Sequence, residues 1–325
     1  MPVKPDQTTA NDRYLTEQHI MSSGDRFAPV AASQPPSSDS PSKPALGPLI
    51  RLYNRAPSEL PSHSALPPGN DAATISAYAA EVLTEAEAFM TSYIPANFKT
   101  KNKDKSSPPA TAPVELLSHE IDAKSIPGAG VVAETWFART SIHENASKTG
   151  TATWAEADAG LRKDHSVHEM EYTPDVKDAH LVLNWSEELA QVNGEVGGWK
   201  DVQAEVREMV HHIPPPLNNR VFTVMVVTAL RKDERQFLVV QMPVEGKGLP
   251  GTKYFQQPKI TPGQYVSIER GELVSEGEWK WQMGTASDAG GNLPMWAQKM
   301  GVPGAVVKDV GLFMDWTAKR RGGNA

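Results

Sequence analysis

Five strand-like segments followed by one amphipathic helix end this chain, and this order constrains the fold more than any other feature of the sequence. Turn-rich residues separate the segments, which occupy residues 199–213, 220–230, 235–244, 263–274 and 278–287. The charged stretches RKDER and SEGE mark hairpins, so neighbouring strands should be antiparallel. One face of the helix expected over residues 302–321 carries Val306, Val310, Phe313, Met314 and Thr317. A long terminal helix packed on a curved antiparallel sheet predicts an α+β fold.

The first 70 residues differ in composition from the rest of the chain. They contain twelve of the 27 prolines, whereas all eight tryptophans lie at or beyond Trp136. Such a segment buries too little apolar surface to offset its ordering entropy, so we expect residues 1–70 to form a disordered arm. We expect one domain over residues 71–322. It begins with a helix over residues 71–94 and contains a solvated linker within residues 95–130.

The middle of the chain gives weaker signals. Residues 131–142 predict a strand and residues 152–164 a short helix, while residues 178–192 fit either structure. The stretch HSVHEMEY at residues 165–172 alternates in polarity and predicts a strand. His165 and His168 point to opposite faces of a strand, so with Glu169 they do not predict a metal site.

Composition excludes several classes of function. The chain has no cysteine, which excludes disulfides, thiol catalysis and cysteine-ligated zinc. Its net charge of -7 argues against a nucleic-acid partner. No apolar run approaches the length of a membrane span, and the first residues lack the pattern of a signal peptide. We therefore expect a cytoplasmic protein without cofactor or metal.

A glycine pair, Gly290 and Gly291, precedes the final helix. A phosphate-binding loop needs a different glycine spacing followed by lysine and a hydroxyl residue, and Asp288 would repel an anion. We therefore interpret the pair as a hinge that lets the helix move as a lid. A second flexible point is expected at Gly301 and Pro303, which would divide the helix into two rigid pieces near residue 302.

Four motifs, taken in order, resemble a known family. They are PPPLNNRVF at residues 214–222, YVSIE at 265–269, DAGGNLPMWAQKMGVP at 288–303 and KDV at 308–310. Together they resemble the START lipid-transfer family, in particular its phosphatidylcholine-transfer branch, and an uncharacterised fungal family of the same helix-grip fold. The resemblance covers roughly residues 130–320. It implies a curved sheet wrapped on the terminal helix around a hydrophobic cavity, which binds a lipid or another hydrophobic molecule.

Departures from the family pattern bear on the ligand. Val221 stands where the family has aspartate, and Phe222 stands where the phosphatidylcholine carriers have tyrosine. The resemblance therefore implies a hydrophobic ligand without specifying its headgroup. The candidate cavity residues are Arg220, Phe222, Glu208, Trp281, Met283, Trp296, Met300, Val306, Val310, Phe313 and Met314.

Alternatives remain open for these residues and for the function. Arg220 could form a polar spot in the cavity facing a carboxylate such as Glu208, or a structural ion pair between strands. The aromatic and methionine residues could line a cavity or simply fill a core. Binding and transfer of a lipid, with transient contact to a membrane surface, is the function expected. The alternatives are a ligand-free scaffold and a polyketide-cyclase-type enzyme, whose acids and bases would come from His168, Glu169, Glu171 and Glu269.

Overall fold

The computed structural model describes residues 46–67, 73–126, 133–292 and 295–323, and for residues 295–298 it describes the backbone only. The strands are β1 Lys99–Lys105, β2 Val114–Ile121, β3 Glu134–Glu144, β4 Val176–Asn184, β5 Trp199–His211, β6 Asn219–Arg231, β7 Gln236–Pro243, β8 Ile260–Ser275 and β9 Glu278–Asp288. The α-helices are α1 Ile75–Ala88, α2 Ile94–Asn97, α3 Trp154–Ala157, α4 His165–Tyr172, α5 Ser186–Ala190 and α6 Met295–Gly323. Single π-helical turns at Phe89–Tyr93 and Asp158–Arg162 follow α1 and α3.

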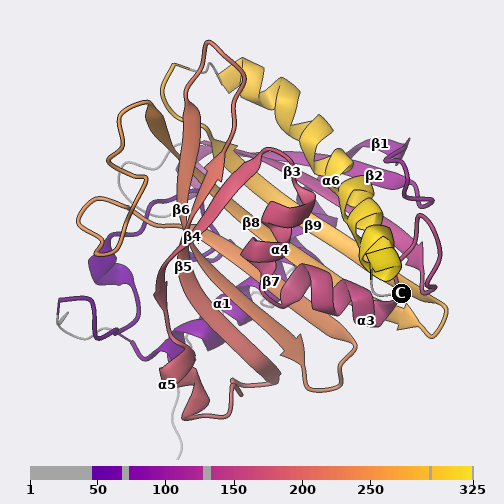
Figure 1. Cartoon of the computed structure of the whole chain (residues 1–325), viewed down its shortest axis with the longest axis horizontal. Helices are drawn as coiled ribbons and strands as arrows, with labels where there is room; N and C mark the ends of the chain where they lie inside the picture. Colours follow the sequence, from indigo (N-terminus) through magenta and orange to yellow (C-terminus); the bar gives the residue numbers. More distant parts are fainter. Residues whose placement is uncertain (1–45, 68–72, 127–132, 293–294, 324–325) are drawn as a thin grey trace, which may run out of the picture. The chain divides into compact units, whose positions relative to one another are not determined.

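The described strands form one curved sheet of nine strands in the order β1-β2-β3-β9-β8-β7-β6-β5-β4 (Figure 1). Neighbouring strands in this order are antiparallel, and the start of β8 also pairs in parallel with the start of β6. The predicted α+β fold, with a curved antiparallel sheet and a long C-terminal helix, is confirmed. All five C-terminal strand segments predicted from the sequence are present.

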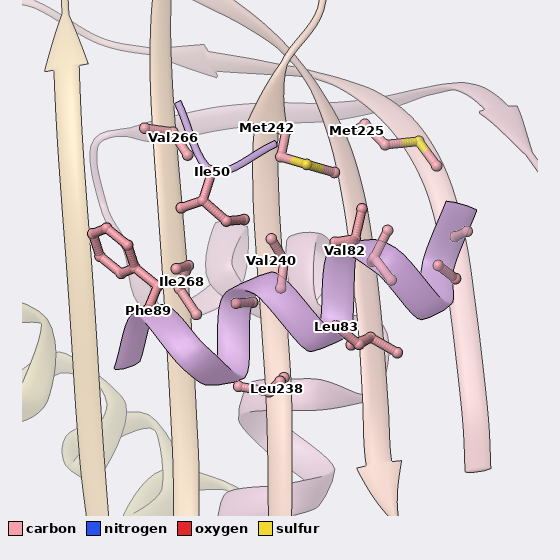
Figure 2. Packing of buried hydrophobic residues seen from close by; sticks show 14 of the residues in the cluster. Ile50, Val82, Leu83, Phe89, Met225, Leu238, Val240, Met242, Val266 and Ile268 are labelled. Carbon is pink, nitrogen blue, oxygen red and sulfur yellow. The ribbon is translucent and has the colours of Figure 1, made fainter. Parts of the chain in front are cut away.

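Helix α1 covers one face of the sheet. Thr74 caps its first turn by accepting a hydrogen bond from the backbone nitrogen of Ala77. Its buried stripe, which includes Val82 and Leu83, packs across the middle strands against Leu238, Val240 and Ile268 (Figure 2). Each such side chain stabilises the fold by about 1.5–3 kcal/mol when fully buried.

Helix α6 covers the opposite face. Successive side chains of β7 point to opposite faces of the sheet, so Leu238 packs under α1, whereas Phe237 and Val239 belong to the hydrophobic cluster under α6. The second half of α6 lies close to the loop that contains Pro108, because a Cβ at Gly311 would stand 2.3 Å from the carbonyl oxygen of Pro108. Phe313 and Met314 are fully buried there. Among the described residues, no helix is both long and apolar enough to cross a membrane.

The expected boundary of the arm is wrong, because residues 46–67 pack on the domain. Ile50 is fully buried beside α1 (Figure 2). The carboxylate of Glu85 on α1 accepts hydrogen bonds from the backbone nitrogens of Leu49 and Ile50. Arg55 exchanges backbone hydrogen bonds with Pro243 and Glu245 at the end of β7. Hydrophobic residues between the prolines, such as Ile50 and Leu60, are buried on the domain, and the overall composition of the segment did not reveal this. Residues 1–45 lie outside the described residues.

Two further expectations are corrected. The linker expected within residues 95–130 contains β1 and β2. Every residue of β1 is exposed. It is an edge strand of the sheet, where lysines are tolerated and oppose edge-to-edge pairing. Residues 165–172 form helix α4 rather than a strand, and the buried His165 and Tyr172 are two turns apart on one face.

The segment at residues 178–192, for which both structures were possible, continues β4 and then forms α5. Helix α6 also differs from expectation, because it runs without a break through Pro303. This proline is the ninth residue of the helix, where it supplies no backbone N–H for a hydrogen bond to the preceding turn.

Replacing Ile50 with alanine should destabilise the protein by about 2–5 kcal/mol, because it opens a cavity beneath the N-terminal segment. Tyr53, in the same segment, is half exposed, so Tyr53→Ala should cost less than about 1 kcal/mol. Equilibrium urea unfolding measures both. Equal stability of Ile50→Ala and the unmodified protein would contradict the packing of residues 46–67.

Candidate ligand cavity

A cavity of about 260 Å³ lies between α6 and the sheet face that it covers. Side chains of Phe222, Trp281 and Met283 form its apolar wall on the sheet. Val302, Val306 and Leu312 form the apolar wall on α6. The cavity opens beside the first half of this helix, where Ala305 is exposed and also lines it.

A row of three residues crosses the floor of the cavity. Register places Arg139 of β3 and Glu269 of β8 on either side of Met283 of β9, so all three share one face. Arg139 is 1% exposed, and its Nη2 lies 3.6 Å from Glu269 Oε2. Its guanidinium carbon lies 3.9 Å above the ring of Trp281, whose Nε1 donates to the same Glu269 oxygen. The side chain of Trp281 thus stacks on the cation of Arg139 and also donates a hydrogen bond to Glu269, the counterion of Arg139.

A chain of hydrogen bonds fixes the next row of polar groups. The hydroxyl of Tyr265 donates to Gln241 Oε1, and Gln241 Nε2 lies 3.1 Å from His165 Nε2. His165 Nδ1 lies 2.6 Å from the carbonyl oxygen of Leu161, which can only accept. His165 therefore carries its proton on Nδ1, and its Nε2 accepts from Gln241. This chain holds α4 against the sheet.

Two carboxyl groups enter the cavity from the helices. Burial raises the pKa of Glu169 on α4, and the nearby Glu269 raises it further, whereas His165 lowers it. Burial also raises the pKa of Asp309 on α6 to about 7; Arg139 opposes this shift, and the other two carboxyls add to it. Around neutral pH, Asp309 is therefore partly protonated.

The turn into α6 is fixed by Arg220. This buried side chain donates to the carbonyl oxygens of Asn218 and Ala289, so it ties the start of β6 to the turn. Gly290 and Gly291 both have positive φ, at 62° and 63°, and a Cβ at Gly290 would stand 2.4 Å from Pro262 O. The pair thus meets a conformational requirement of the turn.

The structure divides the predicted site residues into separate places. Four of them line the cavity: Phe222, Trp281, Met283 and Val306. Three are buried in the cluster beneath α6 without lining it: Val310, Phe313 and Met314. Met300 is 75% exposed, and the side chain of Trp296 lies outside the described residues.

The pairing of Arg220 with Glu208, one of the two alternatives considered for Arg220, is not formed. Glu208 is fully buried and accepts from the backbone nitrogens of Lys253, Tyr254 and Phe255. Among the contacts that the structure gives to Arg220 and Glu208, none joins the two. Neither residue lines the cavity, so both hold loops around it.

Sequence reasoning missed the polar floor. Arg139 lies in a strand that the sequence predicted. The available signal was a charged residue in a strand whose neighbouring residues Trp136 and Ala138 are buried. Its partner Glu269 was noted as a motif position and as a candidate acid or base, but not as the partner of Arg139. Because α4 is a helix, His165 and Glu169 do face one another, with 3.6 Å between Nε2 and Oε2. Within the described ranges, no three histidine or acidic side chains are placed to hold a metal ion.

Comparison with protein families gives one match. The family model described as "Protein of unknown function (DUF3074)" matches residues 136–317, more than half of the chain. The chain belongs to the DUF3074 family. The matched range runs from β3 to α6 and includes every residue that lines the cavity. No curated protein sequence matches this DUF3074 member.

Solved structures resemble this DUF3074 member in fold. Human StAR-related lipid transfer protein 5 aligns with a TM-score of 0.54 at 12% identity, over 76% of this chain and 98% of that one. Human STARD10 gives 0.47 at 11% identity, over 81% and 88%. The human StarD13 lipid transfer and protein localization domain gives 0.43 at 14% identity, over 67% and 87%. The START-like helix-grip fold predicted from the sequence is confirmed.

Alanine at Gly290 should destabilise this DUF3074 member by about 1–3 kcal/mol, because the positive φ and the carbonyl of Pro262 both oppose a Cβ. Gly304 is the matched control: it lies in α6, and a Cβ there meets no atom within 4 Å. Gly304→Ala should stabilise by roughly 0.5–1 kcal/mol. Thermal and urea unfolding compare the two. If both variants change stability alike, the turn is not constrained as described.

Proposed function

We propose that this protein binds a hydrophobic small molecule, such as a lipid, in the cavity between the sheet and α6. The observation that carries the proposal is the cavity itself, walled on both sides by apolar side chains. Burying ~200 Å² of apolar ligand surface there contributes about 5 kcal/mol.

The fold adds support of a general kind. A protein named for lipid transfer, human StAR-related lipid transfer protein 5, has the same fold over most of this chain. Ligand sites usually have volumes of about 300–1,000 Å³, and this cavity lies just below that range. In the described conformation it suits one ring system or one chain. A ligand with two acyl chains requires α6 to move.

We further propose that the first half of α6 opens as a lid. The second half is held by the close approach at Gly311 and by the ion pair of Arg321 with Glu156. In the first half, Gly301 and Gly304 have no neighbours at the Cβ position, and Met300 is exposed. The exposed Met300 suits transient contact with a membrane surface, from which the ligand enters. Opening would break the ion pair of Lys299 with Glu120 of β2, whose charged atoms are 2.8 Å apart.

An enzyme on the same fold is a second candidate. One observation favours it: carboxyl groups with raised pKa, Glu169 and Asp309, line the cavity near Arg139. Such groups are typical of sites that transfer protons. Mass analysis of the recovered ligand separates the two functions, because a carrier returns its ligand unchanged and an enzyme does not.

A tryptophan at Ala305 should block the cavity. Ala305 is exposed yet lines the opening, so the larger side chain can fill the space without disturbing the core. Native mass spectrometry with a panel of phospholipids, sterols and fatty acids should show one-to-one complexes. Ala305→Trp should reduce the bound fraction at least about fivefold, because the filled space no longer admits apolar atoms.

The control is Met300→Trp on the same helix, which lies outside the cavity lining and should bind as the unmodified protein does. An unliganded mass for the unmodified protein across the whole panel would favour the scaffold function instead. Equal binding by Ala305→Trp would place the ligand elsewhere.

A further inference from the structure

A buried cation with unused donors lies at the floor of the cavity. Arg139 is 1% exposed, and among the described residues its Nε and Nη1 have no hydrogen-bond acceptor. The third nitrogen, Nη2, is 3.6 Å from Glu269, which is an ion-pair distance rather than a hydrogen bond. An unpaired buried donor costs about 1–3 kcal/mol, and more when it is charged. A ligand that supplies an acceptor oxygen to these atoms recovers that cost.

The other polar groups of the cavity do not supply this acceptor. Tyr265 donates its hydroxyl hydrogen bond to Gln241, and Gln241 is hydrogen-bonded to His165. Glu169 Oε2 has no hydrogen-bond partner either, so it does not accept from Arg139. The floor therefore presents the free Nε and Nη1 donors of Arg139 to whatever enters.

The charge balance decides between an anionic and a neutral ligand. Glu269 already balances the charge of Arg139, with Trp281 covering the pair. A carboxylate or phosphate ligand adds a further negative charge to this low-dielectric site, which is costly. A neutral oxygen acceptor satisfies Arg139 without this repulsion.

We propose that the ligand is a neutral molecule with an apolar body and a carbonyl oxygen, as in a ketone or ester, and that this oxygen accepts hydrogen bonds from Arg139. The inference rests on the proposed binding function and names its ligand class. The apolar body lies between Met283 and Phe222 of the sheet and Val302 of α6, with the carbonyl at the floor.

Three matched probes test the proposal on the full-length protein. Naphthalene has the apolar ring alone, acetylnaphthalene adds a neutral ketone, and naphthoate adds a carboxylate. Quenching of tryptophan fluorescence reports binding, because Trp281 lines the cavity. Acetylnaphthalene should bind at least about tenfold more tightly than naphthalene, since hydrogen bonds to charged donors strengthen binding by that order. Naphthoate should bind no more tightly than naphthalene.

A double variant tests the role of Arg139. Arg139→Met combined with Glu269→Gln removes both charges together, so neither is left buried alone, and the glutamine oxygen still accepts from Trp281. In this variant the preference for acetylnaphthalene over naphthalene should fall to within about twofold. Affinity for naphthalene should stay within about threefold of that of the unmodified protein, which shows that the cavity is intact.

The probes separate failure of this proposal from failure of the proposed function. If none of the three binds the unmodified protein, hydrophobic binding itself is contradicted. If naphthalene binds and acetylnaphthalene binds equally, water satisfies Arg139 and the inferred ligand class is wrong. Tighter binding of naphthoate than of acetylnaphthalene would show a site for anions. A ketone preference that survives in the double variant would show that Arg139 does not hold the carbonyl.

Discussion

The firm packing of the second half of α6 on the sheet is the interaction on which the cavity depends. Phe313 and Met314 are fully buried there, and Gly311 lets the helix approach the loop at Pro108. Because that half is anchored, the first half is held over the open end of the sheet, where Val302 and Val306 form a wall rather than a filled core. In the proposed lid motion, the second half of the helix stays fixed and the first half moves.

A buried ion pair at the floor distinguishes this cavity from a purely apolar pocket. Arg139 and Glu269 come from strands that are not neighbours, and β9 between them supplies Met283 and Trp281. The pair is therefore built across three strands of the sheet, and any ligand that reaches it must tolerate both charges. In the proposed function, the apolar walls determine how tightly a molecule is held, and the buried pair determines which polar group it must present.

Sequence patterns predicted the architecture well and the site only in part. The strands after residue 199 and the stripe containing Phe313 were predictable, because periodicity reports burial directly. Residues 46–67 and helix α4 were missed, since a few apolar residues among prolines, or eight residues of mixed polarity, carry little periodic signal. The pairing of Arg139 with Glu269 depends on strand order, which one sequence does not contain.

Nuclear magnetic resonance of methyl-labelled methionines tests the central claim most directly, because the methionines sample different sites. Met283 lines the cavity, Met242 lies in the core beneath α1, and Met300 is exposed. On titration with naphthalene, the methyl signal of Met283 should shift through the ring current of the bound probe, while those of Met242 and Met300 should stay in place. A shift of Met242 with Met283 unchanged, or no shift at all, would contradict ligand binding between the sheet and α6.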